Sequence, residues 1–240
     1  MALQKEARSI SVYVSAGFAT APDFLDEFAW QVEQGLKASG WLAKVRIYFP
    51  YGDWRRKGGF QLREIASDMW RGAFKRRAAY GGKHLAAYVQ RHAPAHEPLL
   101  LIGHSGGGVA AVHAANQLEQ AGWPILGVVQ IGSPKCAVAP PLRERTLYVF
   151  TTAESGRKLT AIDPVTRLGT WGGWTSSYYT GIWWDPLKYA PLTRTKLSLI
   201  GGHPDYFRNH APYIQQGQTN LQLTMSSIWT WLQRLYPNQF

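Results

Sequence analysis

The sequence predicts an open, mostly parallel α/β sheet of about six strands with helices on both faces. Short apolar runs alternate along the chain with segments whose apolar residues recur every three or four positions, which is the pattern of strands separated by helices. Strands in that order pair in parallel through right-handed crossovers. The run 99–102 is continuously apolar, which indicates a central strand that is covered on both faces.

Six short runs carry the β-branched, aromatic and aliphatic residues that are typical of strands. They are residues 9–17, 45–49, 99–102, 126–131, 146–151 and 197–200. The second run stops at Pro50, because proline lacks the amide N–H that a strand needs for its ladder.

Helical spacing begins after Pro22 and ends at Gly40. Asp23, Asp26 and Glu27 are expected in the first turn of this helix, where the helix dipole favours negative charge. Further helices are expected over residues 61–92, with an interruption at Gly81-Gly82, and over 106–120, 206–215 and 221–235.

Length and composition are typical of a globular protein with a sizeable core. The chain has 240 residues, of which 45 % are hydrophobic and 13 % aromatic. We expect one domain over residues 1–240, with an excursion at about 153–195 that is too short to form its own core. The single cysteine, Cys136, excludes an internal disulfide and a cysteine-based metal site. We expect no metal and no other cofactor.

The chain is basic, with a formal net charge of +11 at pH 7. Basic clusters at 55–57 and 75–77 would suit an anionic surface, although a uniformly charged soluble protein has the same balance. No specific nucleic-acid motif accompanies the charge. No apolar run approaches the roughly 20 residues of a membrane span, and the N-terminus has no apolar signal core. We therefore expect a cytoplasmic protein, with a removed signal peptide as the alternative.

The third expected strand leads into Gly103-His104-Ser105-Gly106-Gly107, which matches the pattern G-x-S-x-G. In this pattern a serine occupies a strained turn between a strand and a helix, and small neighbours let the two elements approach closely. The turn exposes the hydroxyl at the edge of the sheet where ligands bind in open α/β folds. Ser105 is therefore the candidate nucleophile. A glycine-rich turn that binds a phosphate, or that only packs tightly, is the alternative.

A nucleophilic serine needs a general base, and the base needs a carboxylate to orient it. In this kind of site they follow the serine in the order Asp or Glu, then His. His203, which follows the last expected strand, is the candidate base, whereas His210 is expected on the next helix. Asp163 is the preferred acid and Glu154 the alternative, although an Asp-Pro pair is also common in turns.

The oxyanion hole is expected to use two backbone N–H groups. One belongs to Gly106, directly after the nucleophile, at the positive end of the following helix. The other should come from the loop after the first strand, where Gly17 lets the backbone approach the substrate and Phe18 is the expected donor. A nucleophilic serine with such a hole transfers an acyl group from an ester, a thioester or an amide.

These segments resemble the α/β-hydrolase superfamily in its compact form, the fold of small lipases, cutinases and thioesterases. IGHSGGGVAAVHAA matches the nucleophile turn and its helix, and VVQIGSP is similar to the next strand of class 3, fungal-type lipases. DPVTRLG partly matches the segment that holds the acid in that family, and His203 precedes a Tyr-Phe pair as the family's histidine does. The resemblance implies the α/β-hydrolase fold and a triad of Ser105, Asp163 and His203.

Two segments are candidate walls of a substrate site. The aromatic run 170–189 contains Trp171 and Trp174, which either line an apolar pocket or pack the excursion onto the domain. His104, beside the nucleophile, is a further candidate substrate contact. The helix from Gln61 is either a lid or a crossover helix. Its expected packed face consists of Leu62, Ile65, Met69 and Ala73.

The sequence thus predicts a serine hydrolase that cleaves carboxylic esters of small molecules or lipids, as a lipase or esterase does. A thioesterase, or a hydrolase of polyesters or lactones, is the alternative within this class of enzyme. A non-catalytic binding protein on the same fold is the alternative outside it.

Overall fold

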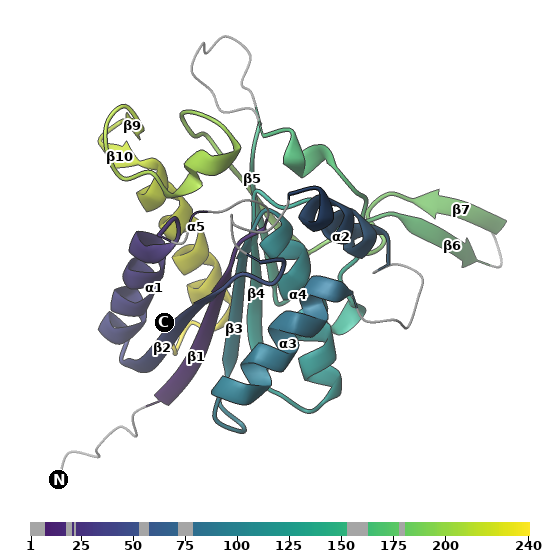
Figure 1. The fold of residues 1–240 in the computed structure, drawn as a ribbon, viewed down its shortest axis with the longest axis horizontal. Coiled ribbons are helices and arrows are strands. Elements are labelled where there is room, and N and C mark those ends of the chain that lie inside the picture. The colour runs from purple at the N-terminus through teal and green to yellow at the C-terminus, as the bar shows by residue number, and fades with distance from the viewer. Residues whose placement is uncertain are drawn as a thin grey trace.

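A six-stranded sheet forms the centre of the structure (Figure 1). The structure is a computed structural model that describes residues 8–17, 21, 23–52, 58–71, 79–152, 163–177 and 181–240. The strand order is β2-β1-β3-β4-β5-β8, and every neighbouring pair is parallel. The strands are β1 (Arg8–Ser15), β2 (Trp41–Tyr48), β3 (Leu99–His104), β4 (Ile125–Ile131), β5 (Thr146–Thr151) and β8 (Thr193–Leu197).

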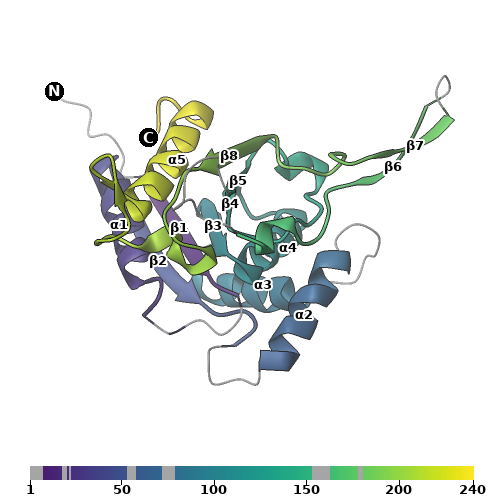
Figure 2. The ribbon, with the colours of Figure 1, turned by 90° about the horizontal axis from the view of Figure 1, so that it is seen from above.

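Helices cover both faces of the sheet, as the sequence predicts (Figures 1 and 2). α1 (Asp26–Ala38) and α5 (Asn220–Leu235) pack on one face, and α3 (Tyr80–His92) and α4 (Gly106–Gln120) pack on the other. α2 (Gly58–Arg71) lies against α3 and α4. The central strand β3 sends Leu100 and Ile102 into the first core and Leu99 and Leu101 into the second. This two-sided burial explains why β3 is apolar at every one of these positions.

The strand order creates a crevice at the carboxyl ends of β1 and β3. The chain moves from β1 outward to β2 and then crosses back to β3 on the other side of β1. Loops that follow β1 and β3 therefore leave the sheet in opposite directions, which is the arrangement that forms ligand sites in open α/β sheets. The turn at Ser105 follows β3, and Gly17 follows β1.

The excursion between β5 and β8 carries a separate hairpin. β6 (Gly173–Ser177) and β7 (Gly181–Asp185) pair only with each other in the described structure, and they project away from the central sheet (Figures 1 and 2). The sixth strand was expected over 197–200, and this placement is wrong: β8 spans Thr193–Leu197 and pairs with β5. β8 is an edge strand, and its side chains alternate between half-buried and exposed. It therefore contains fewer apolar residues than the segment 197–200, where the strand was expected.

The expected helix over 206–215 is also wrong. In its place the chain forms a 3-10 turn, η3 (His203–Phe207), and two short paired strands, β9 (Ile214–Gln215) and β10 (Gln218–Thr219). His210 lies exposed in a bend between η3 and β9. Pro212 interrupts the segment, and a proline removes the N–H that a helix interior requires.

The helical region 61–92 is divided at a different place from the one expected. α2 and α3 are separate helices, and Gly81-Gly82 lie in the first turn of α3. A Cβ on Gly81 would lie 2.4 Å from the ring of Tyr51, so these glycines permit close packing where the sequence suggested a break. Among the described helices, none is long and apolar enough to cross a membrane.

Candidate active site

Ser105 occupies a strained turn between β3 and α4. Its φ is 56° and its ψ is −133°, a backbone conformation that non-glycine residues rarely adopt. The turn is held by backbone hydrogen bonds, because the Ser105 N–H donates to Ile131 O over 3.0 Å and the Gly108 N–H donates to Ser105 O over 3.0 Å. Strain of this kind persists where the surrounding structure enforces it, and it concentrates at functional sites.

The glycines around Ser105 are required by close contacts between backbones. A Cβ on Gly103 would lie 2.2 Å from the carbonyl oxygen of Gly107, and a Cβ on Gly107 would lie 2.4 Å from the carbonyl oxygen of Ser15. Gly17 meets the same turn from β1, because its Cβ would lie 2.5 Å from the nitrogen of Gly106. Gly17, which directly follows β1 and Ala16, therefore lies beside the first N–H of α4.

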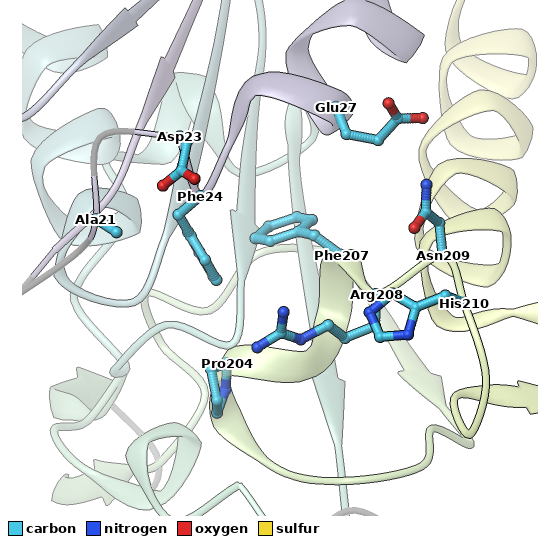
Figure 3. Close-up of a pocket in the computed structure, with 9 residues that line it drawn as sticks. All are labelled: Ala21, Asp23, Phe24, Glu27, Pro204, Phe207, Arg208, Asn209 and His210. Carbon is cyan, nitrogen blue, oxygen red and sulfur yellow. The ribbon is translucent and has the colours of Figure 1, made fainter.

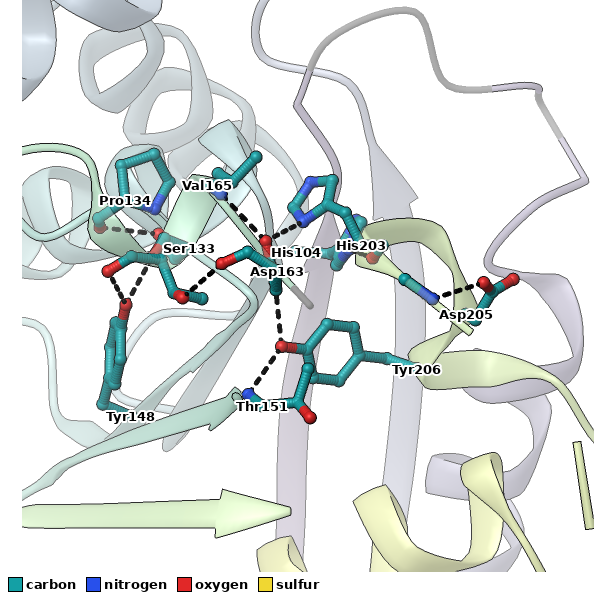
Figure 4. Close-up of polar contacts among 12 residues, drawn as sticks. His104, Ser133, Pro134, Tyr148, Thr151, Asp163, Val165, His203, Asp205 and Tyr206 are labelled. Atoms are coloured by element: carbon teal, nitrogen blue, oxygen red, sulfur yellow. Dashed lines mark hydrogen bonds and ion pairs between the residues drawn. The ribbon is translucent and has the colours of Figure 1, made fainter. Parts of the chain in front are cut away.

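His203 and Asp163, which are far apart in the sequence, are joined by a hydrogen bond (Figure 4). His203 Nδ1 lies 2.9 Å from Asp163 Oδ1. The Asp163 side chain is fully buried, whereas 23 % of the His203 side chain is exposed. A proton on Nδ1 serves this bond, which leaves Nε2 of a neutral ring free to accept a proton.

The Asp163 carboxylate is supported by two further donors (Figure 4). The Val165 N–H donates to Oδ1 over 3.0 Å, and the Tyr206 hydroxyl donates to Oδ2 over 2.9 Å. The Tyr206 oxygen in turn accepts the N–H of Thr151 at the end of β5, over 3.1 Å. Burial, together with the neighbouring Asp163 carboxylate, raises the pKa of Tyr206, so its hydroxyl stays protonated and continues to donate.

The sequence pattern does not identify Tyr206 as a site residue. Its only signal was its place in the Tyr-Phe pair after His203. That pair supported the choice of the base, but nothing in the pattern indicated that the hydroxyl would reach Asp163.

His104 holds the turn that carries His203. Its ring stacks on the His203 ring with centroids 4.7 Å apart, and its Nε2 lies 3.0 Å from the His203 carbonyl oxygen. Burial first, and the nearby His203 second, lower the pKa of His104 to about 3. The ring is therefore neutral at ordinary pH, and the carbonyl partner requires the proton to be on Nε2. Because His104 precedes Ser105, the same contact brings the His203 turn beside the nucleophile turn.

α5 fixes the His203 turn from the other side. The Asn220 side chain donates through Nδ2 to the carbonyl oxygens of Ile200, over 2.7 Å, and Asp205, over 2.8 Å. The Thr224 hydroxyl donates to the carbonyl oxygen of Tyr206 over 3.0 Å. These bonds hold η3 against α5, and the bond from Thr224 satisfies the Tyr206 carbonyl group, which a helix over 206–215 would have used internally.

Of the remaining predicted residues, the structure places the two tryptophans but not Phe18 or Glu154. Phe18 and Glu154 lie outside the described residues. Trp171 is buried against Tyr148 at the base of the excursion, whereas Trp174 is 60 % exposed on the β6–β7 hairpin. In the described structure neither tryptophan has a ring or hydrogen-bond contact with His203 or Asp163.

α2 is anchored to its neighbours through the buried carboxylate of Asp68. This carboxylate accepts hydrogen bonds from the Tyr51 hydroxyl over 3.0 Å and from the N–H groups of Tyr80 and Gly81 over 2.8 Å each. Ile65 packs on Gly106, but Leu62 is 53 % exposed, so the expected packed face is wrong at that position. These contacts indicate that α2 is a crossover helix and not a lid, because a lid must move away from its packing partners readily.

A cavity of about 330 Å³ adjoins the His203 turn (Figure 3). Phe24 and Phe207 form its apolar part, and both rings also contact His104. Asp23, Glu27 and Arg208 add charged groups to the lining. The volume is of the size that accommodates a small organic group.

Comparisons with known proteins find a family model that matches part of the chain. The family model described as Thioesterase domain matches residues 82–147, the segment that contains β3, the Ser105 turn and α4. No curated protein sequence matches the chain.

Solved structures of thioesterases and lipolytic enzymes are similar to the chain over most of its length. The type II thioesterase YbtT of the yersiniabactin biosynthetic pathway has 14 % identity and a TM-score of 0.50, with 98 % of this chain and 96 % of that chain covered. A structure from the study of LipS and LipT, two metagenome-derived lipolytic enzymes, has 12 % identity, a TM-score of 0.48 and 95 % coverage of each chain. The RedJ thioesterase of prodiginine biosynthesis in Streptomyces coelicolor has 11 % identity and a TM-score of 0.46, with 84 % of this chain and 85 % of that chain covered.

The sheet order and the likeness to YbtT show the fold. The chain has the α/β-hydrolase fold, as its sequence predicts.

Proposed function

We propose that this protein is a serine hydrolase that cleaves acyl esters through an acyl-serine intermediate. Ser105 is the nucleophile, His203 the general base and Asp163 the carboxylate that orients it. The observation that carries this proposal is the 2.9 Å hydrogen bond between His203 and Asp163, in a turn that His104 ties to the strained turn of Ser105. A hydrolase of ester-type bonds is also what the family model supports.

In the proposed reaction, His203 Nε2 takes the Ser105 proton while Oγ attacks the carbonyl carbon of the substrate. The buried Asp163 carboxylate stabilises the imidazolium that forms. The Gly106 N–H and the N–H of Phe18 are the proposed donors to the oxyanion, and α4 adds the positive end of its dipole. His203 then returns the proton to the leaving group, and a water molecule releases the acyl group by the reverse sequence.

The substrate class proposed first is a carboxylic ester, with the acyl or alcohol part held in the cavity beside Phe24 and Phe207. A thioester is the second candidate, and the match to the Thioesterase domain model over the nucleophile segment favours it. The chemistry at the serine is the same for both, because only the leaving group differs.

Covalent labelling tests the nucleophile. A fluorophosphonate probe should label the wild-type protein at Ser105 and should not label Ser105→Ala. His203→Ala and Asp163→Asn should lose hydrolysis while their circular dichroism stays native. Glu154→Gln is the matched control for the acid and should retain activity. A folded protein that is not labelled at Ser105 would overturn the proposal, and an active Asp163→Asn variant would overturn the choice of acid.

Paired substrates decide the bond type. A series of nitrophenyl esters and thioesters with the same acyl chains should be compared by kcat/KM. A carboxylic-ester hydrolase should prefer the esters at every chain length, after correction for the intrinsic reactivity of each leaving group. A consistent preference for thioesters would select the second candidate.

A further inference from the structure

The β6–β7 hairpin carries an exposed apolar face that nothing in the described structure covers. Trp174 pairs with Trp184 across the two strands, and Ser176 pairs with Ile182. Side chains two residues apart on a strand share a face, so Trp174, Ile182 and Trp184 lie on the same side of the hairpin. We call these three residues the Trp face. Their exposed fractions are 60 %, 75 % and 42 %.

The hairpin holds this face away from the core. It lies within the excursion between β5 and β8, and it projects from the body of the protein in both views (Figures 1 and 2). The two tryptophan rings meet edge to face with centroids 5.5 Å apart, which stiffens the pair without burying it. A two-stranded hairpin is marginally stable alone in water, so large apolar residues on its open side indicate that another surface normally meets it.

Positive charge surrounds the base of the hairpin. Lys135 Nζ and the Arg194 guanidinium lie 5.4 and 5.8 Å from the ring centre of Trp171. Lys188 donates a hydrogen bond to the carbonyl oxygen of Trp174. Among the described residues from 163 to 197, the only acidic residues are Asp163 and Asp185, and Asp163 is buried in the candidate active site.

We propose that the Trp face docks onto the surface of a bilayer that contains anionic phospholipids. Tryptophan concentrates at the boundary between headgroups and acyl chains, and lysine and arginine beside it attract anionic headgroups. A second copy of this chain is disfavoured as the occupant, because it would bring two clusters of the same positive charge together. The proposal does not depend on the hydrolase activity.

Vesicle binding tests the proposal with the intact protein. The wild-type protein should sediment with vesicles of equimolar phosphatidylcholine and phosphatidylglycerol, and binding to pure phosphatidylcholine vesicles should be about tenfold weaker. Trp174→Ser combined with Ile182→Ser should reduce binding to the anionic vesicles about tenfold. Trp30 is a matched control, because it is 58 % exposed on α1, and Trp30→Ser should bind as the wild type does.

The charged part of the surface is tested separately. Lys188→Gln with Arg194→Gln should weaken binding to the anionic vesicles only, and added salt should have the same effect. No binding of the wild-type protein, or equal binding by the Trp174/Ile182 double variant, would overturn the proposal. A wild-type dimer in gel filtration that becomes a monomer in that double variant would also overturn it, because the occupant would then be a second copy.

Discussion

The Tyr206 hydroxyl is the most informative single group to remove. Tyr206→Phe keeps the buried ring but deletes the donor to Asp163 Oδ2 at 2.9 Å and the acceptor for the Thr151 N–H at 3.1 Å. A hydrogen bond to a charged group contributes about 1.5–3 kcal/mol, and a buried N–H without a partner costs about 1–3 kcal/mol. We therefore expect the free energy of unfolding to fall by about 3 kcal/mol.

The same substitution should lower the rate of hydrolysis. If the loss of this hydrogen bond raises the activation free energy by about 1.4 kcal/mol, kcat falls about tenfold. KM should stay unchanged, because Tyr206 is 0 % exposed and does not reach the substrate. The assay is steady-state hydrolysis of a nitrophenyl ester, combined with urea unfolding followed by circular dichroism.

Tyr148→Phe is the matched control, since its buried hydroxyl donates to the Ser133 carbonyl oxygen and does not contact Asp163. It should lose stability and keep its kcat. A Tyr206→Phe variant with wild-type kcat would refute the reasoning, and so would an equal loss of kcat in the control. Either result would mean that Tyr206 acts on stability alone.

Three further substitutions follow from the same contacts. Gly17→Ala should abolish most hydrolysis in an ester assay and also lower the melting temperature, because its Cβ would lie 2.5 Å from the Gly106 nitrogen and would displace backbone; an active variant would place the oxyanion donors elsewhere. Burial lowers the pKa of His104 from 6.5 to about 3, so the unfolded state binds more protons between these values and stability should fall as pH decreases from 6.5 towards 3. Urea unfolding of His104→Gln should show a shallower dependence on pH over that window, and an unchanged slope would contradict the assignment. Asp68→Asn weakens the acceptor of three hydrogen bonds and should lower the free energy of unfolding by about 2 kcal/mol; a variant as stable as the wild type in urea would show that α2 is not anchored there.

The central part of the fold could be predicted because its signals are local and strong. The strand before Ser105, the turn and the following helix are found where the sequence placed them, since a continuously apolar run, a glycine cluster and a helical spacing follow one another. The pairing of Asp163 with His203 was anticipated from the order of acid and base along the chain, although nothing local indicated their contact.

The errors occur where contacts between distant residues decide the conformation. Residues 206–215 have helical spacing, but Asn220 and Thr224 of α5 bind the carbonyl groups of this turn and hold it in another shape. β8 was misplaced because an edge strand with alternating charged residues has little apolar signal of its own. In both cases a partner elsewhere in the chain sets the final conformation, although Pro212 is also a local signal against a helix over 206–215.

The bonds from Asn220 and Thr224 also have a consequence for biosynthesis. A ribosome-bound chain that ends before α5 already contains every residue proposed for catalysis, including Ser105 and His203. It lacks the side chains that hold the loop of the base in place. We therefore expect the proposed hydrolysis to begin only after α5 has been synthesised and has packed against η3.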